Sequence, residues 1–298
     1  MTKIKREKSK LYMDTVVQIQ VFTETSKDEA EAKINRAFEA FQKIERACSR
    51  FNPDSELMRA CRQIQRPVQV SPFLFEPLKF ALEIAKWTDG IFDPTVGKAM
   101  EEQGFNRQYL TGKFMESPAS VSATYRDIVL NERDRTVYLR KPMVIDLGAV
   151  AKGFAIDLAV NELKDLERFC VNAGGDLFAG GAEPGAGVWK IGIRHPTQND
   201  RIIHTVEISN EAICTSGGYE RKSPKRKGVH HLILPHTKQS PNDWISCSVI
   251  APFAMLADAF STAVFLSGVE RGKSLIEEAE LKGILITSGL QIMKVGGI

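Results

Sequence analysis

The sequence predicts an α+β protein in which antiparallel strand pairs and amphipathic helices form one unit. Short strands of alternating polarity occur in pairs joined by tight turns, helical segments separate the groups of strands, and the regular strand–helix–strand alternation of βαβ proteins is missing. Of the 298 residues, 43% are hydrophobic and 26% are charged, which is ordinary for a globular protein. This composition excludes disorder as the main state of the chain.

The N-terminal third is predicted to contain one strand and two helices. Alternating polarity over residues 15–22 predicts the first strand. Ser26 and Glu29 have the spacing of a capping box, and apolar residues at every third or fourth position after them predict a long helix. Asn-Pro-Asp-Ser at 52–55 indicates a turn or a new helix cap. A second helix is predicted over residues 72–88, ending before an Asp-Gly pair.

The remainder of the chain is richer in strands. The predicted elements are a hairpin of residues 128–130 and 137–139, a buried strand beginning at 144–147, a helix over 153–166, glycine-punctuated strands between 170 and 213, a strand at 246–251 and a last helix over 252–266. We find no internal repeat and no flexible linker in the sequence. Residues 13–298 are therefore expected to form a single domain of one or two lobes, preceded by a basic tail of residues 1–12.

The net charge of +3 is small, but the charges are unevenly distributed. The first ten residues carry five Lys or Arg and one Glu, and a second basic run occupies residues 221–227. This run is interpreted either as a solvated loop or as a rim that attracts an anionic ligand. Nucleic-acid binding is not expected as the main role, because the basic runs lack interleaved aromatic residues.

The sequence also bears on cellular location and on the state of the cysteines. No apolar run approaches the ~20 residues of a membrane-spanning helix, and the basic start is not followed by the apolar segment of a secretory signal. A cytoplasmic protein without a membrane span is therefore expected. The five cysteines are scattered without C-x-x-C spacing, which argues against a disulfide framework and a thiolate zinc site.

Four segments combine small residues with polar side chains in a way that suggests ligand binding. Residues 88–97 are typical of a ligand-lining loop, but also of an ordinary turn. In residues 145–153, a strand ending in Asp146 leads through Gly148 and Ala149 into a helix that carries Lys152, so backbone amides could face phosphate oxygens. The spacing is that of neither a P-loop nor a dinucleotide fingerprint. Residues 171–177, with two adjacent glycines, indicate either a tight bulge or a ligand contact.

The fourth segment, residues 257–263, suggests a metal site. Asp258, Ser261 and Thr262 share one face of a predicted helix that is otherwise apolar. A buried acid beside two hydroxyl groups is unfavourable unless it is paired. A hard cation such as Mg²⁺ would satisfy these oxygens, whereas local hydrogen bonding of the hydroxyl groups to the helix backbone is the alternative.

Together, these segments resemble the ApbE-type FAD:protein FMN transferases, in the same order and over most of the chain. The matching runs are residues 13–15, 49–57, 88–97, 145–153, 172–177, 216–221, 231–235 and 257–263. The resemblance implies a T-fold-like α+β fold. It also implies Mg²⁺-dependent transfer of the FMN half of FAD to a Thr or Ser hydroxyl of an acceptor flavoprotein, with release of AMP.

The resemblance also assigns roles to individual residues. It places the metal on the carbonyl of Ala149 and on Asp258, Ser261 and Thr262. It gives His231 and Asp258 catalytic roles. The expected FAD contacts are Met13, Phe51, Ile91, Phe92, Asp93, Asp146, Lys152 and Leu232.

The chain departs from the family pattern at a few positions. The usual Met-Gly-Thr contains Asp14 in place of glycine, and the segment after His231 contains Leu234 and Lys238 where the family has an acid and a glycine. Three hypotheses follow. The first is a flavin transferase, the second is a Mg²⁺-dependent pyrophosphatase that converts FAD to FMN and AMP, and the third is an FAD-binding module without catalysis.

Overall fold

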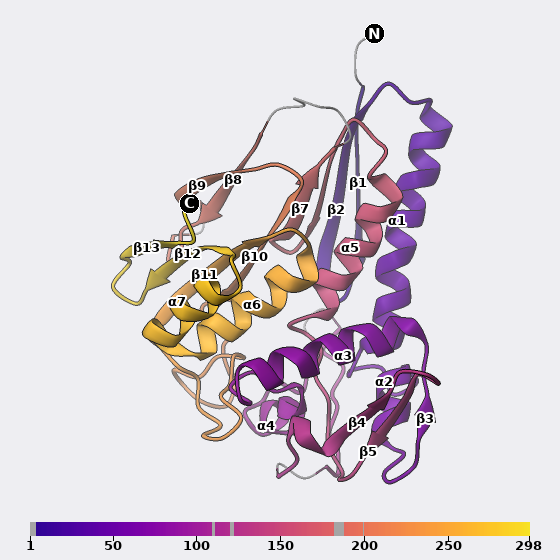
Figure 1. Ribbon diagram of the computed structural model, residues 1–298, viewed down its shortest axis with the longest axis vertical. Coiled ribbons are helices and arrows are strands. Elements are labelled where there is room, and N and C mark those ends of the chain that lie inside the picture. Colours follow the sequence, from indigo (N-terminus) through magenta and orange to yellow (C-terminus); the bar gives the residue numbers. More distant parts are fainter. Residues whose placement is uncertain (1–3, 109–110, 120–121, 182–187, 199) are drawn as a thin grey trace.

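A large antiparallel sheet forms the centre of the protein. The computed structural model describes residues 4–108, 111–119, 122–181, 188–198 and 200–298. Eight strands pair in the order β1-β2-β6-β7-β10-β11-β12-β13, with every neighbouring pair antiparallel (Figure 1). Their bounds are β1 Ile4–Tyr12, β2 Thr15–Thr23, β6 Arg168–Ala173, β7 Asp176–Gly180, β10 Glu211–Gly217, β11 Trp244–Ala251, β12 Lys282–Thr287 and β13 Ile292–Val295. The predicted α+β class is confirmed.

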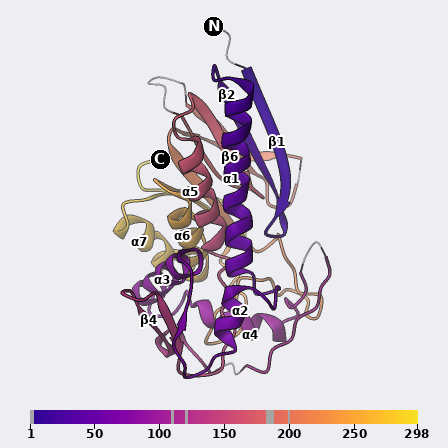
Figure 2. The same cartoon turned by 90° about the vertical axis from the view of Figure 1, so that its right-hand side faces the viewer.

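The helices α1 (Lys27–Cys48), α5 (Ala151–Leu163), α6 (Ala254–Leu266) and α7 (Gly268–Glu278) cover one face of this sheet (Figures 1 and 2). Successive residues of a strand point to opposite faces. On β10, Ala212 and Cys214 join the main core with the helices, whereas Ile213 belongs to a second apolar cluster. That cluster lies under the hairpin of β8 (Trp189–Arg194) and β9 (Ile202–Ile208), which therefore covers part of the other face.

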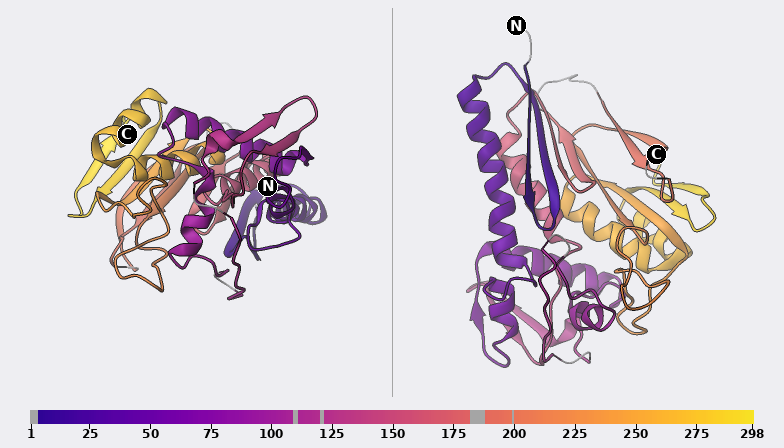
Figure 3. Two further views of the ribbon diagram at one scale, coloured as in Figure 1. Left: turned by 90° about the horizontal axis from the view of Figure 1, so that it is seen from below. Right: turned by 180° about the vertical axis from the view of Figure 1, so that it is seen from behind.

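A smaller lobe lies beyond one end of the sheet, as Figures 1 and 3 show. It contains the three-stranded sheet β3-β5-β4. Its elements are α2 Glu56–Cys61, β3 Val68–Gln69, α3 Pro72–Trp87, η1 Pro94–Val96, α4 Gly97–Glu102, η2 Tyr125–Asp127, β4 Ile128–Asn131 and β5 Thr136–Leu139. The lobe is inserted between α1 and α5, two helices that pack against each other.

The large sheet consists of two halves with the same order of elements. Each half is a hairpin, two helices and a second hairpin: β1-β2, α1, α5, β6-β7, and then β10-β11, α6, α7, β12-β13. In both halves the inner strands pair in the same way, β2 with β6 and β11 with β12. This repeat of architecture is not visible in the sequence, because the two halves share a pattern of elements rather than of residues.

Most of the predicted elements are present, with three differences. The first strand is not at residue 15, because residues 4–12 of the expected basic tail form β1 and pair with β2 along their whole length. Residues 144–147 are not a strand. They form a largely buried, irregular segment that is hydrogen-bonded to the small lobe. Gly97 N donates to Val144 O at 3.2 Å, and Asp146 N donates to Pro94 O at 2.8 Å. The helix ending at Leu266 is not the last one, since α7 follows it.

Within the ranges given above, no helix combines the length and the apolar character that crossing a bilayer requires.

Candidate functional site

A cavity of about 610 Å³ lies where the two halves of the sheet meet the small lobe. Its walls come from the β1–β2 turn, the loop before α5, the β6–β7 turn, β10, the segment 231–233 and α6. Segments far apart in the sequence thus converge on one space. Of the residues expected to bind FAD or metal or to act in catalysis, the ones on the cavity wall are Met13, Phe51, Phe92, Asp93, Asp146, Ala149, Lys152, His231, Leu232, Asp258 and Thr262.

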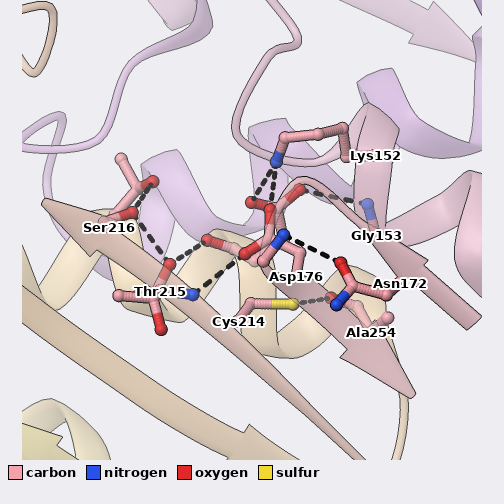
Figure 4. Close-up of polar contacts among 12 residues, drawn as sticks. Lys152, Gly153, Asn172, Asp176, Cys214, Thr215, Ser216 and Ala254 are labelled. Carbon is pink, nitrogen blue, oxygen red and sulfur yellow. Dashed lines mark hydrogen bonds and ion pairs between the residues drawn. The ribbon is translucent and has the colours of Figure 1, made fainter. Parts of the chain in front are cut away.

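One part of the wall is a cluster of one lysine and two acids, of which Figure 4 labels Lys152 and Asp176. The ammonium of Lys152 forms an ion pair with Asp176 Oδ2 and lies 3.4 Å from Asp258 Oδ1. The second oxygen of Asp176 accepts a hydrogen bond from Thr215 N at 2.9 Å. Burial opposes the charge on Lys152, but the two carboxylates outweigh it and raise the pKa of the ammonium. Burial raises the pKa of Asp258 to about 7, although Lys152 acts in the opposite direction.

Two helices meet beside this cluster and cap each other. Asp258 of α6 accepts from Gly153 N in the first turn of α5, at 3.1 Å. Asp157 of α5 accepts from Ala254 N at 2.6 Å and Met255 N at 2.9 Å, in the first turn of α6. Each helix N-terminus has amide groups without intrahelical partners, and each obtains an acceptor from the other helix. The approach requires glycine at 153, because a Cβ there would lie 2.4 Å from the Ala254 carbonyl oxygen.

A group of buried hydroxyls joins α6 to strand β10. Ser216 Oγ is 2.9 Å from both Ser261 Oγ and Thr262 Oγ1, and Ser261 Oγ donates to Asp258 O at 2.9 Å. Thr262 is on the cavity wall, one turn after Asp258. Ser261 is fully buried behind the wall, so its hydroxyl supports the neighbouring groups and does not face the cavity.

Arg50 connects the cavity to the small lobe. The guanidinium forms an ion pair with Asp146 through Nε and donates to Phe105 O at 2.6 Å. It also stacks over the ring of Phe51, with 4.2 Å between the guanidinium carbon and the ring centroid. The remaining oxygen of Asp146 accepts from Gly148 N at 2.7 Å, in the loop that leads into α5. Asp146 is thereby fixed between the lobe and the sheet.

Two tight hairpin turns form another wall of the cavity. Met13 and Asp14 have φ of 52° and 60°, and Gly174 and Gly175 have φ of 67° and 105°. Two successive residues with positive φ are typical of type I′ turns. Asp14 therefore occupies a left-handed position, where the family pattern has glycine. The turns approach so closely that a Cβ on Gly174 would lie 2.2 Å from the Thr15 hydroxyl oxygen.

The loop 88–97 contributes mainly through Phe92 and Asp93. Asp93 accepts from Thr95 N at 2.8 Å and from Tyr125 N at 3.0 Å, and burial raises the pKa of its carboxyl group. Its carboxylate thus organises the start of η1. Ile91 packs partly buried against the main core and does not line the cavity.

His231 lies on the cavity wall, in the segment that follows the basic residues 221–227. Its backbone N donates to Arg221 O at 3.1 Å, and its ring meets Phe105 edge-on. Burial, with Arg221 and His230 nearby, lowers the pKa of the imidazole to about 3, so the ring is neutral at pH 7. Among the described residues, none forms a hydrogen bond with its Nδ1.

The structure brings in several residues that were not among the expected site residues. Arg50 lies inside a matching run but has no role assigned by the resemblance, and Asp176 lies in residues 171–177, for which a tight bulge and a ligand contact were both left open. Neither has a sequence signal of its own, because the partners that define them are 96 and 24 residues away along the chain. The other polar residues on the wall that had no assigned role are Asp14, Thr15, Glu45, Ser49, Gln108, Asn172, Arg194, Thr215, Ser216, Tyr219 and Glu220.

The donor set fits a divalent cation that prefers oxygen. Asp258 and Thr262 present a carboxylate and a hydroxyl from successive turns, and Ala149 lies on the same wall. Two buried carboxyl groups face a single ammonium, so the cluster lacks one positive charge when both acids are ionised. The described residues contain no cluster of three or more His, Cys, Asp or Glu suited to a metal. Mg²⁺ does not require one, since it uses one or two carboxylates and obtains its other ligands from water and phosphate.

Comparison with known proteins agrees with this arrangement. The sequence profile of the ApbE family matches residues 13–285. A FAD:protein FMN transferase of Treponema pallidum is 31% identical over 294 residues, covering 91% of this chain and 81% of its own length. One from Haemophilus influenzae is 28% identical, with 92% and 84% covered. The crystal structure of the ApbE protein of Thermotoga maritima is 26% identical with a TM-score of 0.84, covering 98% and 97%. The chain belongs to the ApbE family.

Proposed function

We propose that this protein transfers the FMN moiety of FAD to a Thr or Ser hydroxyl of an acceptor protein, releases AMP and requires Mg²⁺. The convergence of eleven expected site residues from across the chain on one cavity wall carries this proposal. The names of the Treponema pallidum and Haemophilus influenzae relatives support the same reaction class.

The reaction exchanges the phosphoanhydride bond of FAD for a phosphoester bond to the acceptor. The acceptor oxygen forms a bond to the flavin-side phosphorus of FAD, the bond from that phosphorus to the AMP phosphate oxygen breaks, and the hydroxyl proton leaves. Such a displacement depends mainly on positioning and on neutralising the phosphoryl oxygens. Lys152 and Arg221 are the cations on the wall best suited to this role, because both line the cavity beside predicted site residues.

The metal would be held by Asp258, Thr262 and the carbonyl of Ala149, with Ser261 supporting Thr262 through Ser216. When bound there, Mg²⁺ supplies charge neutralisation for the diphosphate and orients the leaving group. Gly153 N fixes one oxygen of Asp258, which leaves Oδ1 as the oxygen available for a cation.

His231 is the proposed proton-handling group. A neutral imidazole has one ring nitrogen without a proton, which can accept a hydrogen bond from the acceptor hydroxyl. For FAD itself, Phe51 offers one face of its ring for stacking, since Arg50 covers the other. Met13, Phe92, Asp93, Asp146 and Leu232 would complete the contacts, with Ile91 behind them.

A product assay tests the proposal. Purified protein is incubated with FAD and Mg²⁺, with and without an acceptor domain, and nucleotides are separated by chromatography while acceptor mass is measured. AMP that forms only with acceptor, together with an acceptor mass increase equal to FMN, is the expected result. AMP and free FMN without acceptor would show a pyrophosphatase instead. FAD binding without AMP would show a binding module.

The metal assignment has its own variant and control. Asp258→Asn should reduce AMP formation roughly 100-fold or more, because the carboxylate ligand is lost. Asp134→Asn, at an exposed turn of the small lobe, should leave the rate unchanged. Full activity of Asp258→Asn, or of the wild type in EDTA, would overturn the metal assignment.

A further inference from the structure

The cluster of Lys152, Asp176 and Asp258 contains a cation that competes with the proposed metal. The Lys152 ammonium is paired with Asp176 and also lies 3.4 Å from Asp258 Oδ1, the oxygen that the metal would use. Asp176 is itself held by the backbone of Thr215, as Figure 4 shows. The ammonium is therefore anchored from the Asp176 side and extends to Asp258.

A metal ion and this ammonium cannot both lie close to Asp258 without repulsion. Mg²⁺ binds oxygen at about 2.1 Å, so an ion on Oδ1 would be within roughly 6 Å of an unmoved ammonium. Asp258 cannot turn away freely, because Gly153 N holds its other oxygen. The side chains of Asp176 and Asp258 are 8% and 5% exposed, so water screens the repulsion poorly.

We propose that Lys152 is a stand-in cation: it neutralises Asp258 in the metal-free protein, and the metal must displace it from Asp258 while Asp176 retains it. Asp176 is then a positioning residue that gives the displaced ammonium a partner. The inference rests on the proposed function only for the existence of the metal site.

The mechanism predicts opposite effects for two substitutions. Lys152→Met removes the competitor and leaves two carboxylates for the metal, so metal affinity rises. Asp176→Asn leaves Lys152 with Asp258 as its only carboxylate partner in the cluster, so the metal displaces it less easily and affinity falls. If Lys152 and Asp176 had merely structural roles, each substitution would weaken metal binding or leave it unchanged.

The test is Mn²⁺ binding without FAD, followed by the electron paramagnetic resonance of free Mn²⁺. Lys152→Met should bind Mn²⁺ about tenfold more tightly than the wild type and Asp176→Asn about tenfold less tightly. Lys152→Arg, which keeps the charge, should stay within about threefold of the wild type. Thermal unfolding is the second readout. In EDTA, Lys152→Met should melt at a lower temperature than the wild type, and Mn²⁺ should raise the melting temperature of this variant by more than that of the wild type.

The outcomes separate this inference from the proposed function. If the wild type binds Mn²⁺ and Lys152→Met binds it no more tightly, the stand-in role is wrong and the metal site remains. If neither the wild type nor any variant binds Mn²⁺, the metal assignment fails and this inference fails with it.

Discussion

Lys238 shows how a single departure from the family pattern affects the backbone. The family has glycine at this position, and Lys238 adopts a φ of 56° in the turn after His231. The turn is closed by Lys238 N donating to Leu234 O at 2.8 Å and Leu234 N donating to Gln239 O at 2.9 Å. A side chain in the left-handed region costs about 1–2 kcal/mol. The segment keeps its conformation at that cost, with Leu234 packed against the main core.

Lys238→Gly should therefore stabilise the protein. We expect the free energy of unfolding to rise by about 1 kcal/mol, less than the full strain because glycine adds freedom to the unfolded chain. Urea denaturation measures the change. Lys238→Ala is the matched control: it keeps the strain and removes only the exposed ion pair with Glu102, so it should stay within about 0.5 kcal/mol of the wild type. Equal stabilities for the Gly and Ala variants would contradict the strain argument.

At the scale of elements, the junction of α5 and α6 determines the site. Gly153→Ala would place a methyl group 2.4 Å from the Ala254 carbonyl oxygen and 2.6 Å from the Met255 Cα, both of them backbone atoms. The helices must separate, which weakens the Gly153–Asp258 hydrogen bond. We expect a loss of about 2–3 kcal/mol in the free energy of unfolding, together with weaker Mn²⁺ binding.

The control for that substitution is Gly289→Ala. A Cβ at residue 289 meets only the Thr287 hydroxyl oxygen, at 3.8 Å, so this variant should melt like the wild type. If Gly153→Ala melted like the wild type as well, the close approach of the two helices would not be essential.

Asp157 makes the same junction sensitive to pH. Burial raises the pKa of this carboxyl group to about 6, while Ala254 N and Met255 N act in the opposite direction. The pKa of an aspartate in the unfolded chain is about 3.9, so the folded state keeps this proton to higher pH. Stability is therefore lost as pH rises from about 4 to 6. The side chain in Asp157→Asn does not titrate. Relative to that variant, the free energy of unfolding of the wild type should fall by about 2 kcal/mol between pH 4 and 7.

Denaturation of both proteins at pH 4 and pH 7 measures this difference. Asp165→Asn is a suitable control, because the side chain of Asp165 is 72% exposed. A constant difference between the wild type and Asp157→Asn across this pH range would show that the carboxyl group does not titrate as described.

Local sequence patterns predicted the elements that have one buried face, and missed those that do not. The long helix α1 and strand β2 have regular apolar spacing, and both were predicted close to their observed bounds. Strand β1 has no such spacing, because its half-buried positions include Arg6 and Lys8. This edge strand covers α1 with the aliphatic parts of its lysine side chains. The Lys10 ammonium lies 4.8 Å from the centroid of the Phe38 ring. Val144, Ile145 and Leu147 are apolar and buried, but they pair with no strand.

The site was predictable to the extent that its residues lie in recognisable local motifs. Asp258 and Thr262 share a helix face, which spacing alone indicates. Arg50 and Asp176 acquire their roles from partners that the fold brings close, Asp146 and Lys152 respectively. The reciprocal capping of α5 and α6 is likewise a tertiary feature, since neither helix has a side-chain cap from its own N-cap residue.

At the scale of the whole molecule, the site lies where the two sheet halves and the small lobe join. Lys152 comes from the first half, Asp258 from the second, and Arg50 fastens the lobe through Asp146. The basic segment 221–227 begins at this cavity with Arg221 and continues along the small lobe, where Ser223 Oγ donates to Gln103 O. Its remaining cations, Lys222, Lys225, Arg226 and Lys227, are exposed and form no ion pair with a described residue.

This position predicts that the basic segment guides an acidic acceptor to the site. The double variant Lys225→Glu, Arg226→Glu should raise the KM for the acceptor about tenfold at low salt and leave kcat nearly unchanged, because rim charges act on encounter more than on chemistry. The effect should shrink as ionic strength rises. The control is Lys27→Glu, which also reverses the charge of a lysine. Lys27 is the first residue of α1, at the end of that helix away from the small lobe (Figure 1), so this variant should leave KM unchanged. An unaltered KM in the double variant at low salt would mean that the acceptor approaches the cavity over another surface. The exposed side of the β8–β9 hairpin, which lines the cavity through Arg194, would be the next surface to test.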